Sequence, residues 1–87
     1  MRRSRTTKTF RDQLARLPKS VRQSAHKAYV LWDSDPYHPS LNFKKLDDSL
    51  YSARIAYNWR AVAYKDADTF VWFFIGSHAE YDQLGRR

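Results

Sequence analysis

The sequence predicts an α+β domain: a hairpin of two N-terminal helices packed on a small, largely antiparallel sheet of three to four strands, with a short C-terminal helical turn. In the first 33 residues apolar side chains recur every three or four positions, as on one face of a helix. From residue 41 onward they alternate at every second position, as in a strand with one buried face. The 87 residues suffice for one domain, residues 1–87, in which residues 1–8 are expected to form a basic lead-in.

The first helix is expected to carry its apolar face on Phe10, Leu14 and Leu17, and Pro18 ends it. The second helix is expected over residues 19–33. Its apolar positions follow a spacing of four, three and four residues: Val21, Ala25, Ala28 and Trp32. Asp35-Pro36 then stops this helix, because a residue before proline disfavours the helical region. We interpret both apolar faces as parts of the core.

Four stretches after the helices are expected to form strands: residues 41–46, 51–57, 59–65 and 70–75. The last of these stretches is apolar on both faces and is therefore expected at the centre of the sheet, covered on both sides. Ser77 and Glu80 match a capping box, in which each side chain bonds the backbone amide of the other residue. A helical turn is therefore predicted to begin at His78.

The composition is that of a basic, cysteine-free protein, and its charge alone favours a solvated surface over a negatively charged partner. The chain has 16 Lys and Arg against 9 Asp and Glu, and 11 of the basic residues lie within residues 1–45. A small basic domain rich in aromatic residues commonly binds a polyanion or an acidic protein segment. The absence of cysteine excludes disulfides and thiolate metal sites. We expect no cofactor, no metal, no membrane partner and a cytoplasmic location.

Arg54 and Arg60 are expected on consecutive strands and are the first candidates for a functional site. An odd number of loop residues would place both guanidinium groups on one face of the sheet, and a three-residue loop at residues 56–58 would pair them directly. A loop of two or four residues would separate them. Two like charges held together destabilise a sheet unless an anion or a carboxylate lies between them. Either Asp47 or Asp48 neutralises one arginine, or the pair binds a phosphate.

Four further side chains are candidates for the same site. Lys44 and Lys45 lie on the neighbouring segment, and strand alternation sends only one of them to each face. His78 and Tyr81 lie three residues apart and therefore share one face of the C-terminal turn. Together with the arginines, these side chains would provide both cations and groups that transfer protons.

This combination suits the cleavage of RNA through its own 2′-hydroxyl group. The reaction needs a base for the 2′-hydroxyl proton, an acid for the departing 5′-oxygen and cations around the phosphorus. It requires no metal. Arg54 and Arg60 would hold the phosphate, and His78 would act as the acid or the base. Tyr81 would stack on a base or donate a proton, and one of the two lysines would join the site.

Five stretches carry a resemblance to a known family: residues 10–18, 35–46, 51–55, 59–62 and 73–82. Their order and spacing resemble the RelE/ParE superfamily of bacterial toxins from type II toxin–antitoxin systems. The likeness extends from about Thr7 to Leu84. It is closest to a small branch that ends in Ile-Gly-Ser-His-x-Glu-Tyr-Asp, which corresponds here to residues 75–82.

The resemblance implies a RelE-like fold, an antitoxin protein that wraps the toxin and, in RelE-like members, cleavage of mRNA in the ribosomal A site. By position, Arg54 resembles a catalytic basic residue of the family, and Arg60 resembles its phosphate-stabilising arginine. His78 resembles the histidine that several relatives use as general acid. Ser52 stands where some relatives have a lysine that assists proton abstraction. The first strand of the family has little apolar character here, at residues 3–9.

Three functions follow as alternatives. The first is a ribosome-dependent mRNA endoribonuclease, an mRNA interferase that inhibits translation and whose partners are an antitoxin and mRNA on the ribosome. The second is an inhibitor of DNA gyrase, as in ParE-like relatives, which share the scaffold and need no nuclease site. The third is a catalytically inactive, toxin-like binding module. Burial of His78 against core aromatic residues, or a hairpin loop of even length, would favour the second or the third.

Overall fold

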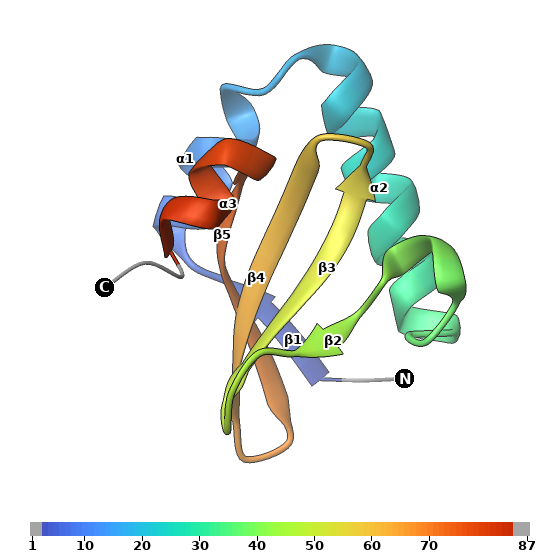
Figure 1. The fold of residues 1–87 in the computed structure, drawn as a ribbon, viewed down its shortest axis with the longest axis vertical. Helices are drawn as coiled ribbons and strands as arrows, with labels where there is room; N and C mark the ends of the chain where they lie inside the picture. The colour runs from blue at the N-terminus through green and yellow to red at the C-terminus, as the bar shows by residue number, and fades with distance from the viewer. Residues whose placement is uncertain (1–2, 85–87) are drawn as a thin grey trace.

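The computed structural model describes residues 3–84 and confirms the α+β class (Figure 1). The elements follow one another as β1 (Arg3–Thr6), α1 (Lys8–Ala15), α2 (Lys19–Ser34), the 3₁₀ helix η1 (Pro39–Leu41), β2 (Lys44–Lys45), β3 (Leu50–Ala56), β4 (Trp59–Asp66), β5 (Thr69–Ser77) and α3 (His78–Leu84). The strands form one sheet in the order β1-β5-β4-β3-β2. Neighbouring strands are antiparallel, except that β1 runs parallel to β5.

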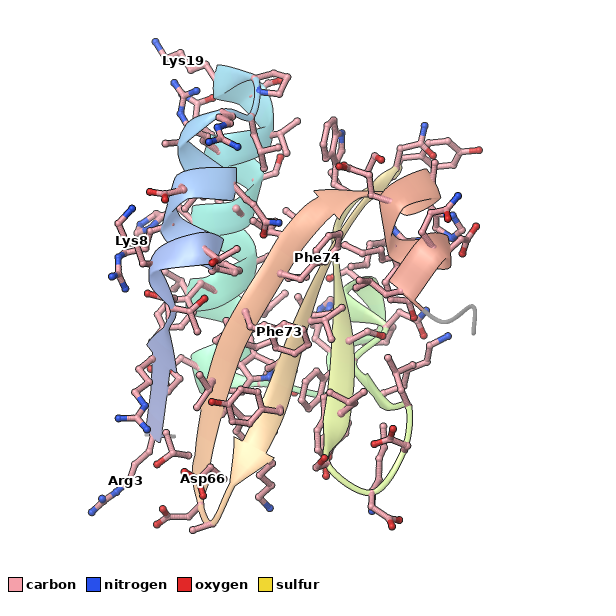
Figure 2. The ribbon with its side chains drawn as sticks, turned by 90° about the vertical axis from the view of Figure 1, so that its left-hand side faces the viewer. Arg3, Lys8, Lys19, Asp66, Phe73 and Phe74 are labelled. Atoms are coloured by element: carbon pink, nitrogen blue, oxygen red, sulfur yellow. The ribbon has the colours of Figure 1, made fainter. Side chains whose placement is uncertain are left out.

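Helices α1 and α2 cover one face of the sheet, whereas α3 lies on the other face (Figure 2). Local sequence explains where the first two begin and end. The Thr7 hydroxyl accepts a hydrogen bond from the Phe10 amide at 3.1 Å and so caps α1. Pro18 directly precedes α2, and Asp35 follows it. Within residues 3–84, no helix is both long enough and apolar enough to cross a membrane.

The core fills the space between α1, α2 and the sheet. Trp32 of α2 lies at its centre with 2% of its surface exposed. Its ring meets the rings of Phe70 and Trp72 edge-on, each at a centroid distance of 5.3 Å, an arrangement that aromatic pairs favour. The apolar positions of α2 are therefore core positions, as the sequence predicts.

Strand β1 is a fifth strand, which the sequence analysis does not anticipate because residues 3–6 contain no apolar side chain. Its pairing with β5 uses backbone groups and so does not depend on apolar side chains. The Ser4 and Tyr29 hydroxyl groups share a hydrogen bond of 2.8 Å, which fastens β1 to α2. The expected basic lead-in is therefore part of the sheet from residue 3, and residues 1 and 2 lie outside the described residues.

The prediction of a strand over residues 41–46 is mostly wrong, because β2 contains only Lys44 and Lys45. Leu41 belongs to η1, and the next residue, Asn42, has a left-handed φ of 43° that interrupts extended backbone. The three longer strands lie close to their expected positions. Strand β5 is an interior strand, but β4 rather than β5 is the middle strand of the five.

Candidate active site

The strand register assigns side chains to the two faces of the sheet, because residues directly opposite each other on neighbouring strands point to the same face. We call the face opposite α1 and α2 the open face. One row across it consists of Arg54, Arg60 and Gly76. The next row consists of Lys44, Ser52, Val62 and Phe74. The two predicted arginines therefore lie side by side on the open face.

A β-bulge brings the arginines together. The turn between β3 and β4 has only two residues, Tyr57 and Asn58, so of the loop lengths left open by the sequence the even one occurs. The expectation that a two-residue loop would separate the arginines is wrong. Ala56 is opposite Trp59, whereas Arg54 is opposite Arg60, so Ile55 is an extra residue on β3. The extra residue shifts the register by one, so that Arg54 rather than Ile55 is opposite Arg60 and both arginines lie on one face.

Arg60 is held firmly by the hairpin. Its Nη1 donates hydrogen bonds to the backbone carbonyls of Ala56, Tyr57 and Trp59 at 3.2, 3.3 and 3.1 Å. Partial burial lowers the pKa of the Arg60 guanidinium, and the charge of Arg54 lowers it further. All three bonds use Nη1, so within residues 3–84 the Nε and Nη2 donors have no protein acceptor. These donors form the edge that a phosphate can bind in a bidentate manner.

No carboxylate neutralises the arginine pair within the described part of the chain. Asp47 accepts hydrogen bonds from the amides of Ser49 and Leu50 at 3.0 and 3.1 Å, so it stabilises a turn instead. The ion pairs among residues 3–84 do not include either arginine. Tyr81 and then Asp82 raise the pKa of Arg60, but burial and the charge of Arg54 lower it by more. The structure therefore favours the anion-site alternative over the Asp47 or Asp48 alternative.

His78 is accessible and held in place at the edge of this arginine pair. Its side chain is 43% exposed, and Nδ1 lies 3.3 Å from a carboxylate oxygen of Asp82. Its backbone amide donates to the carbonyl of Asn58 at 2.6 Å, which ties the start of α3 to the β3–β4 turn. The ring centroids of His78 and Tyr81 are 5.8 Å apart. His78 is thus not buried against core aromatic residues.

Tyr81 extends from α3 across the open face. Its hydroxyl donates to Oγ of Ser52 at 3.3 Å, which joins α3 to β3. The capping box predicted from the sequence is present: the Ser77 amide donates to Oε1 of Glu80 at 2.9 Å, and the Glu80 amide donates to Oγ of Ser77 at 3.2 Å. Gly76 leaves room for the Glu80 side chain to reach the Ser77 amide, since an added Cβ would lie 2.8 Å from Oε1 of Glu80.

Only one of the two predicted lysines shares the open face with the arginines. Lys44 is opposite Ser52, which Tyr81 contacts, whereas Lys45 is opposite Tyr51. Strand alternation therefore directs Lys45 toward the opposite face. Lys44 is therefore the lysine that shares the face of the arginines, and Lys45, the other candidate for RNA binding, lies on the opposite face.

Sequence reasoning overlooks two supporting residues. Asp82 holds His78, and Ser52 accepts the hydrogen bond of Tyr81. The spacing of four residues between His78 and Asp82 on a helix could have indicated the first contact. No local pattern indicates the second contact, because Ser52 and Tyr81 lie 29 residues apart.

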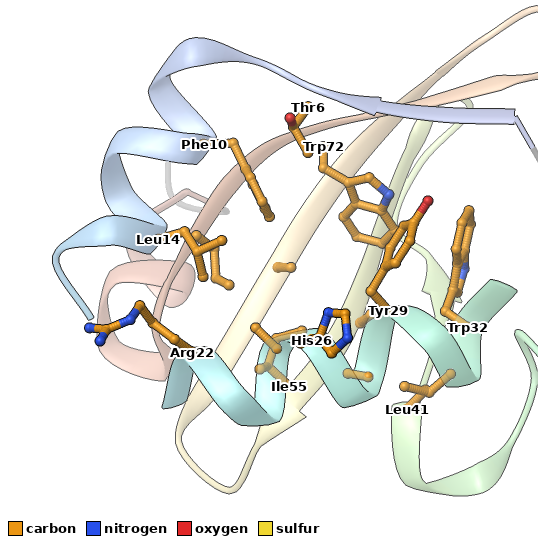
Figure 3. Close-up of a pocket in the computed structure, with 15 residues that line it drawn as sticks. Thr6, Phe10, Leu14, Arg22, His26, Tyr29, Trp32, Leu41, Ile55 and Trp72 are labelled. Carbon is orange, nitrogen blue, oxygen red and sulfur yellow. The ribbon is translucent and has the colours of Figure 1, made fainter. Parts of the chain in front are cut away.

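A separate apolar cavity of 270 Å³ lies on the opposite side of the sheet, between α1 and α2 (Figure 3). Phe10 and Leu14 of α1 border it on one side, and Ala28 and Tyr29 of α2 border it on the other. Trp72 of β5 lies at its base. We call this cavity the helix groove.

A family model described as the ParE-like toxin domain matches residues 19–83 of this chain. The chain belongs to the ParE-like toxin domain family. This result confirms the resemblance to the RelE/ParE superfamily that the sequence carries. A comparison with curated proteins gives no match.

Solved structures of toxins have the same fold. The RelB–RelE antitoxin–toxin complex of Methanococcus jannaschii contains a chain similar to this one, with a TM-score of 0.73 and 18% identity over 93% of this chain and 98% of that chain. The RelE–RelB complex of Pyrococcus horikoshii OT3 gives a TM-score of 0.73 and 17% identity, over 99% and 98% of the two chains. YafQ of E. coli gives a TM-score of 0.73 and 11% identity, over 93% and 98%. At these identities the likeness establishes the fold.

Proposed function

We propose that this protein is the toxin of a type II toxin–antitoxin module and that it acts as a metal-independent endoribonuclease on mRNA at the ribosome. One observation supports the nuclease activity above all others. Arg54 and Arg60 are directly opposite each other, and no carboxylate forms an ion pair with either within residues 3–84. Such a pair is unfavourable in the free protein and favourable around a phosphate. The partly exposed His78 begins α3, and its backbone amide bonds the carbonyl of Asn58 in the turn between the two strands that carry the arginines.

The proposed reaction uses the 2′-hydroxyl of the RNA as the nucleophile. The 2′-oxygen forms a bond to phosphorus while the bond from phosphorus to the 5′-oxygen breaks, and one proton leaves the 2′-hydroxyl as another reaches the 5′-oxygen. Arg54 and Arg60 stabilise the charge on the phosphorus oxygens. His78 performs one of the two proton transfers through Nε2, since Asp82 holds Nδ1. Tyr81 stacks on a base or donates a proton.

Induced expression in a bacterial host tests this proposal, with translation and the 5′ ends of mRNA followed together. His78→Ala and Arg60→Ala are each expected to abolish growth arrest and the new mRNA ends. The matched controls His26→Ala and Arg16→Ala remove the same side-chain types from exposed positions on or beside the helices and should retain both effects. Arrest with new mRNA ends that survives His78→Ala would refute the nuclease mechanism.

Inhibition of DNA gyrase is the second candidate, and the description of the matching family as ParE-like favours it. A gyrase inhibitor does not need His78 or Arg60. Growth arrest that persists in both variants without new mRNA ends, together with loss of gyrase supercoiling activity in a purified assay, would support this function. The absence of any arrest in the wild type would support an inactive binding module.

The proposed antitoxin partner has a suitable docking surface in the helix groove. The groove is apolar and the exposed Arg22 lines it, while α1 and α2 carry further exposed basic side chains outside the groove: Lys8, Arg11, Lys19 and Lys27. Charge complementarity therefore favours an amphipathic antitoxin helix with acidic flanks. The known structures of related complexes named RelB–RelE contain an antitoxin together with the toxin.

A charge placed in the helix groove tests this assignment. Ala28→Glu is expected to weaken binding of the antitoxin, measured by calorimetry with the purified pair, because it places a charge on the apolar wall. Gln23→Glu adds the same charge to an exposed position of α2 outside the groove and is expected to bind normally. Equal affinities of the two variants would place the antitoxin elsewhere.

A further inference from the structure

The open face continues beyond the candidate active site as a second surface. A row across β1, β5, β4 and β3 consists of Arg5, Val71, Tyr64 and Leu50. It lies two rows away from the arginine pair, so that Tyr64 and Arg60, four residues apart on one strand, are separated by about 13 Å. The strand missed by the sequence analysis, β1, contributes Arg5 to this row.

Aromatic side chains form the middle of this surface. The rings of Tyr64 and Phe73 are in contact, with a centroid distance of 5.8 Å, and Tyr64 is 38% exposed. A second bulge, between β4 and β5, creates the contact: Val62 is opposite Phe74 and Ala63 is opposite Trp72, which leaves Phe73 as an extra residue. Figure 2 shows Phe73 on the side of β5 that faces away from α1 and α2.

Cations border these rings on both edges of the sheet. Arg5 on β1 and Lys44 on β2 are exposed, and neither forms an ion pair among residues 3–84. Arg5 is two strands away from Tyr64, or about 10 Å. Exposed carboxylates lie at both ends of this row: Asp66 and Asp68 at the β4–β5 connection, where Asp68 pairs with Arg3 at 3.7 Å, and Asp47 and Asp48 just before Leu50. The row between this surface and the arginine pair carries the exposed Lys44 at its edge, whereas its other members, Ser52, Val62 and Phe74, are buried.

We propose that this aromatic surface, made of Tyr64 and Phe73 and bordered by Arg5 and Lys44, is a stacking platform for the bases of single-stranded RNA next to the cleaved phosphate. Exposed aromatic rings on a sheet with flanking cations suit unpaired bases and their phosphates. The separation of about 13 Å between Tyr64 and Arg60 gives the platform its place along the RNA strand. This inference rests on the proposed nuclease function, which it extends from the cleaved phosphate to the neighbouring nucleotides.

The test is a binding measurement with the full chain and a fluorescein-labelled ten-nucleotide RNA, whose 2′-O-methyl groups prevent cleavage. Fluorescence anisotropy gives the affinity at several salt concentrations. Tyr64→Leu keeps an apolar side chain but removes the ring, and we expect it to weaken binding about 5- to 150-fold. Tyr64→Phe keeps the ring and is expected to bind as the wild type does.

Arg5→Ala provides an independent variant that does not alter the aromatic contact. It is expected to reduce the slope of log affinity against log salt concentration by about 0.7, as the loss of one phosphate contact does. The matched control is Arg16→Ala, which removes the same charge next to α1, away from the open face, and should leave the slope unchanged.

The outcomes separate this inference from the proposed function. RNA binding that depends on Tyr64, combined with growth arrest that persists in His78→Ala, would support the platform and refute the nuclease. Growth arrest that requires His78, combined with normal RNA binding by Tyr64→Leu, would refute the platform and assign the aromatic surface to a protein partner. A wild type that does not bind the RNA would also refute the platform, as would equal slopes for Arg5→Ala and Arg16→Ala.

Discussion

Replacing Arg54 with glutamine is expected to stabilise the free protein and at the same time to remove its preference for phosphate. Arg54 is exposed and directly opposite Arg60, whose guanidinium the hairpin carbonyls hold in place. Glutamine keeps most of the length and polarity of the side chain but removes the charge. The substitution therefore isolates the repulsion between the two arginines.

The expected gain in stability of Arg54→Gln follows from the strand register, which places Arg54 directly opposite Arg60. Like charges directly opposite each other in a sheet cost about 0.2–1 kcal/mol, and solvent screening at these accessible positions favours a value of about 0.5 kcal/mol. For a domain of this size, that gain corresponds to a rise in melting temperature of about 2–4 °C. A bound anion instead stabilises the wild type relative to the variant, because a ligand at 100 times its dissociation constant stabilises the native state that binds it by about 2.7 kcal/mol.

Thermal denaturation in low salt, with and without inorganic phosphate, measures both effects. Without phosphate, Arg54→Gln is expected to melt above the wild type. With saturating phosphate the order should reverse, because only the wild type keeps the paired site. Arg16→Gln is the matched control: it makes the same substitution at an exposed position next to α1, away from the open face, and should change neither the melting temperature nor the phosphate-induced shift.

Two results would refute this reasoning. The first is an Arg54→Gln variant that melts below the wild type in low salt, which would mean that Arg54 stabilises the free protein. The second is an equal phosphate-induced shift in both proteins. In 1 M KCl the difference between the free proteins should vanish, because the Debye length falls to about 3 Å.

Further predictions concern the connection between β5 and α3, and the core. Gly76→Ala is expected to lower the free energy of unfolding, measured by urea denaturation, by about 1–3 kcal/mol and to lower toxicity. The reason is that its Cβ would lie 2.8 Å from Oε1 of Glu80 and 2.9 Å from Cζ of Phe74. Unchanged stability would show that Glu80 moves aside freely. Trp32→Ala, at a position 2% exposed, is expected to lower the free energy of unfolding by about 3–5 kcal/mol in the same assay. Val30→Ala, 55% exposed on the same helix, should change it by less than about 0.5 kcal/mol, and similar losses in both variants would contradict the assignment of the core.

Local patterns were sufficient for the helices and the long strands. Apolar spacing and Pro18 placed α2 at residues 19–33, and the structure gives Lys19–Ser34. The alternation around Arg54 and Arg60 placed β3 and β4 within one or two residues at each end. These features were predictable because helix stripes, proline stops and strand alternation depend on neighbours within a few residues.

The candidate site was only partly predictable. Spacing selected Arg54, Arg60 and His78 as candidates, and a resemblance gave them roles. The sequence left their pairing open, because it made the pairing depend on the loop length, whereas the structure makes it depend on the bulge at Ile55. A bulge is a property of two strands in register, and one strand's sequence does not reveal it.

The sequence by itself determined the order of α1, α2, the three long strands and α3, the core faces of α1 and α2, and the basic character of the chain, because these follow from local periodicity and composition. The tertiary structure decided which distant residues meet. It paired the polar β1 with β5, placed Arg5 and Tyr64 in one row, and brought Tyr81 onto Ser52. The physical reason is that these contacts join residues far apart in the chain. Backbone hydrogen bonds make the contacts between strands, and the packing of α3 on the open face makes the contact between Tyr81 and Ser52. No apolar pattern encodes those contacts.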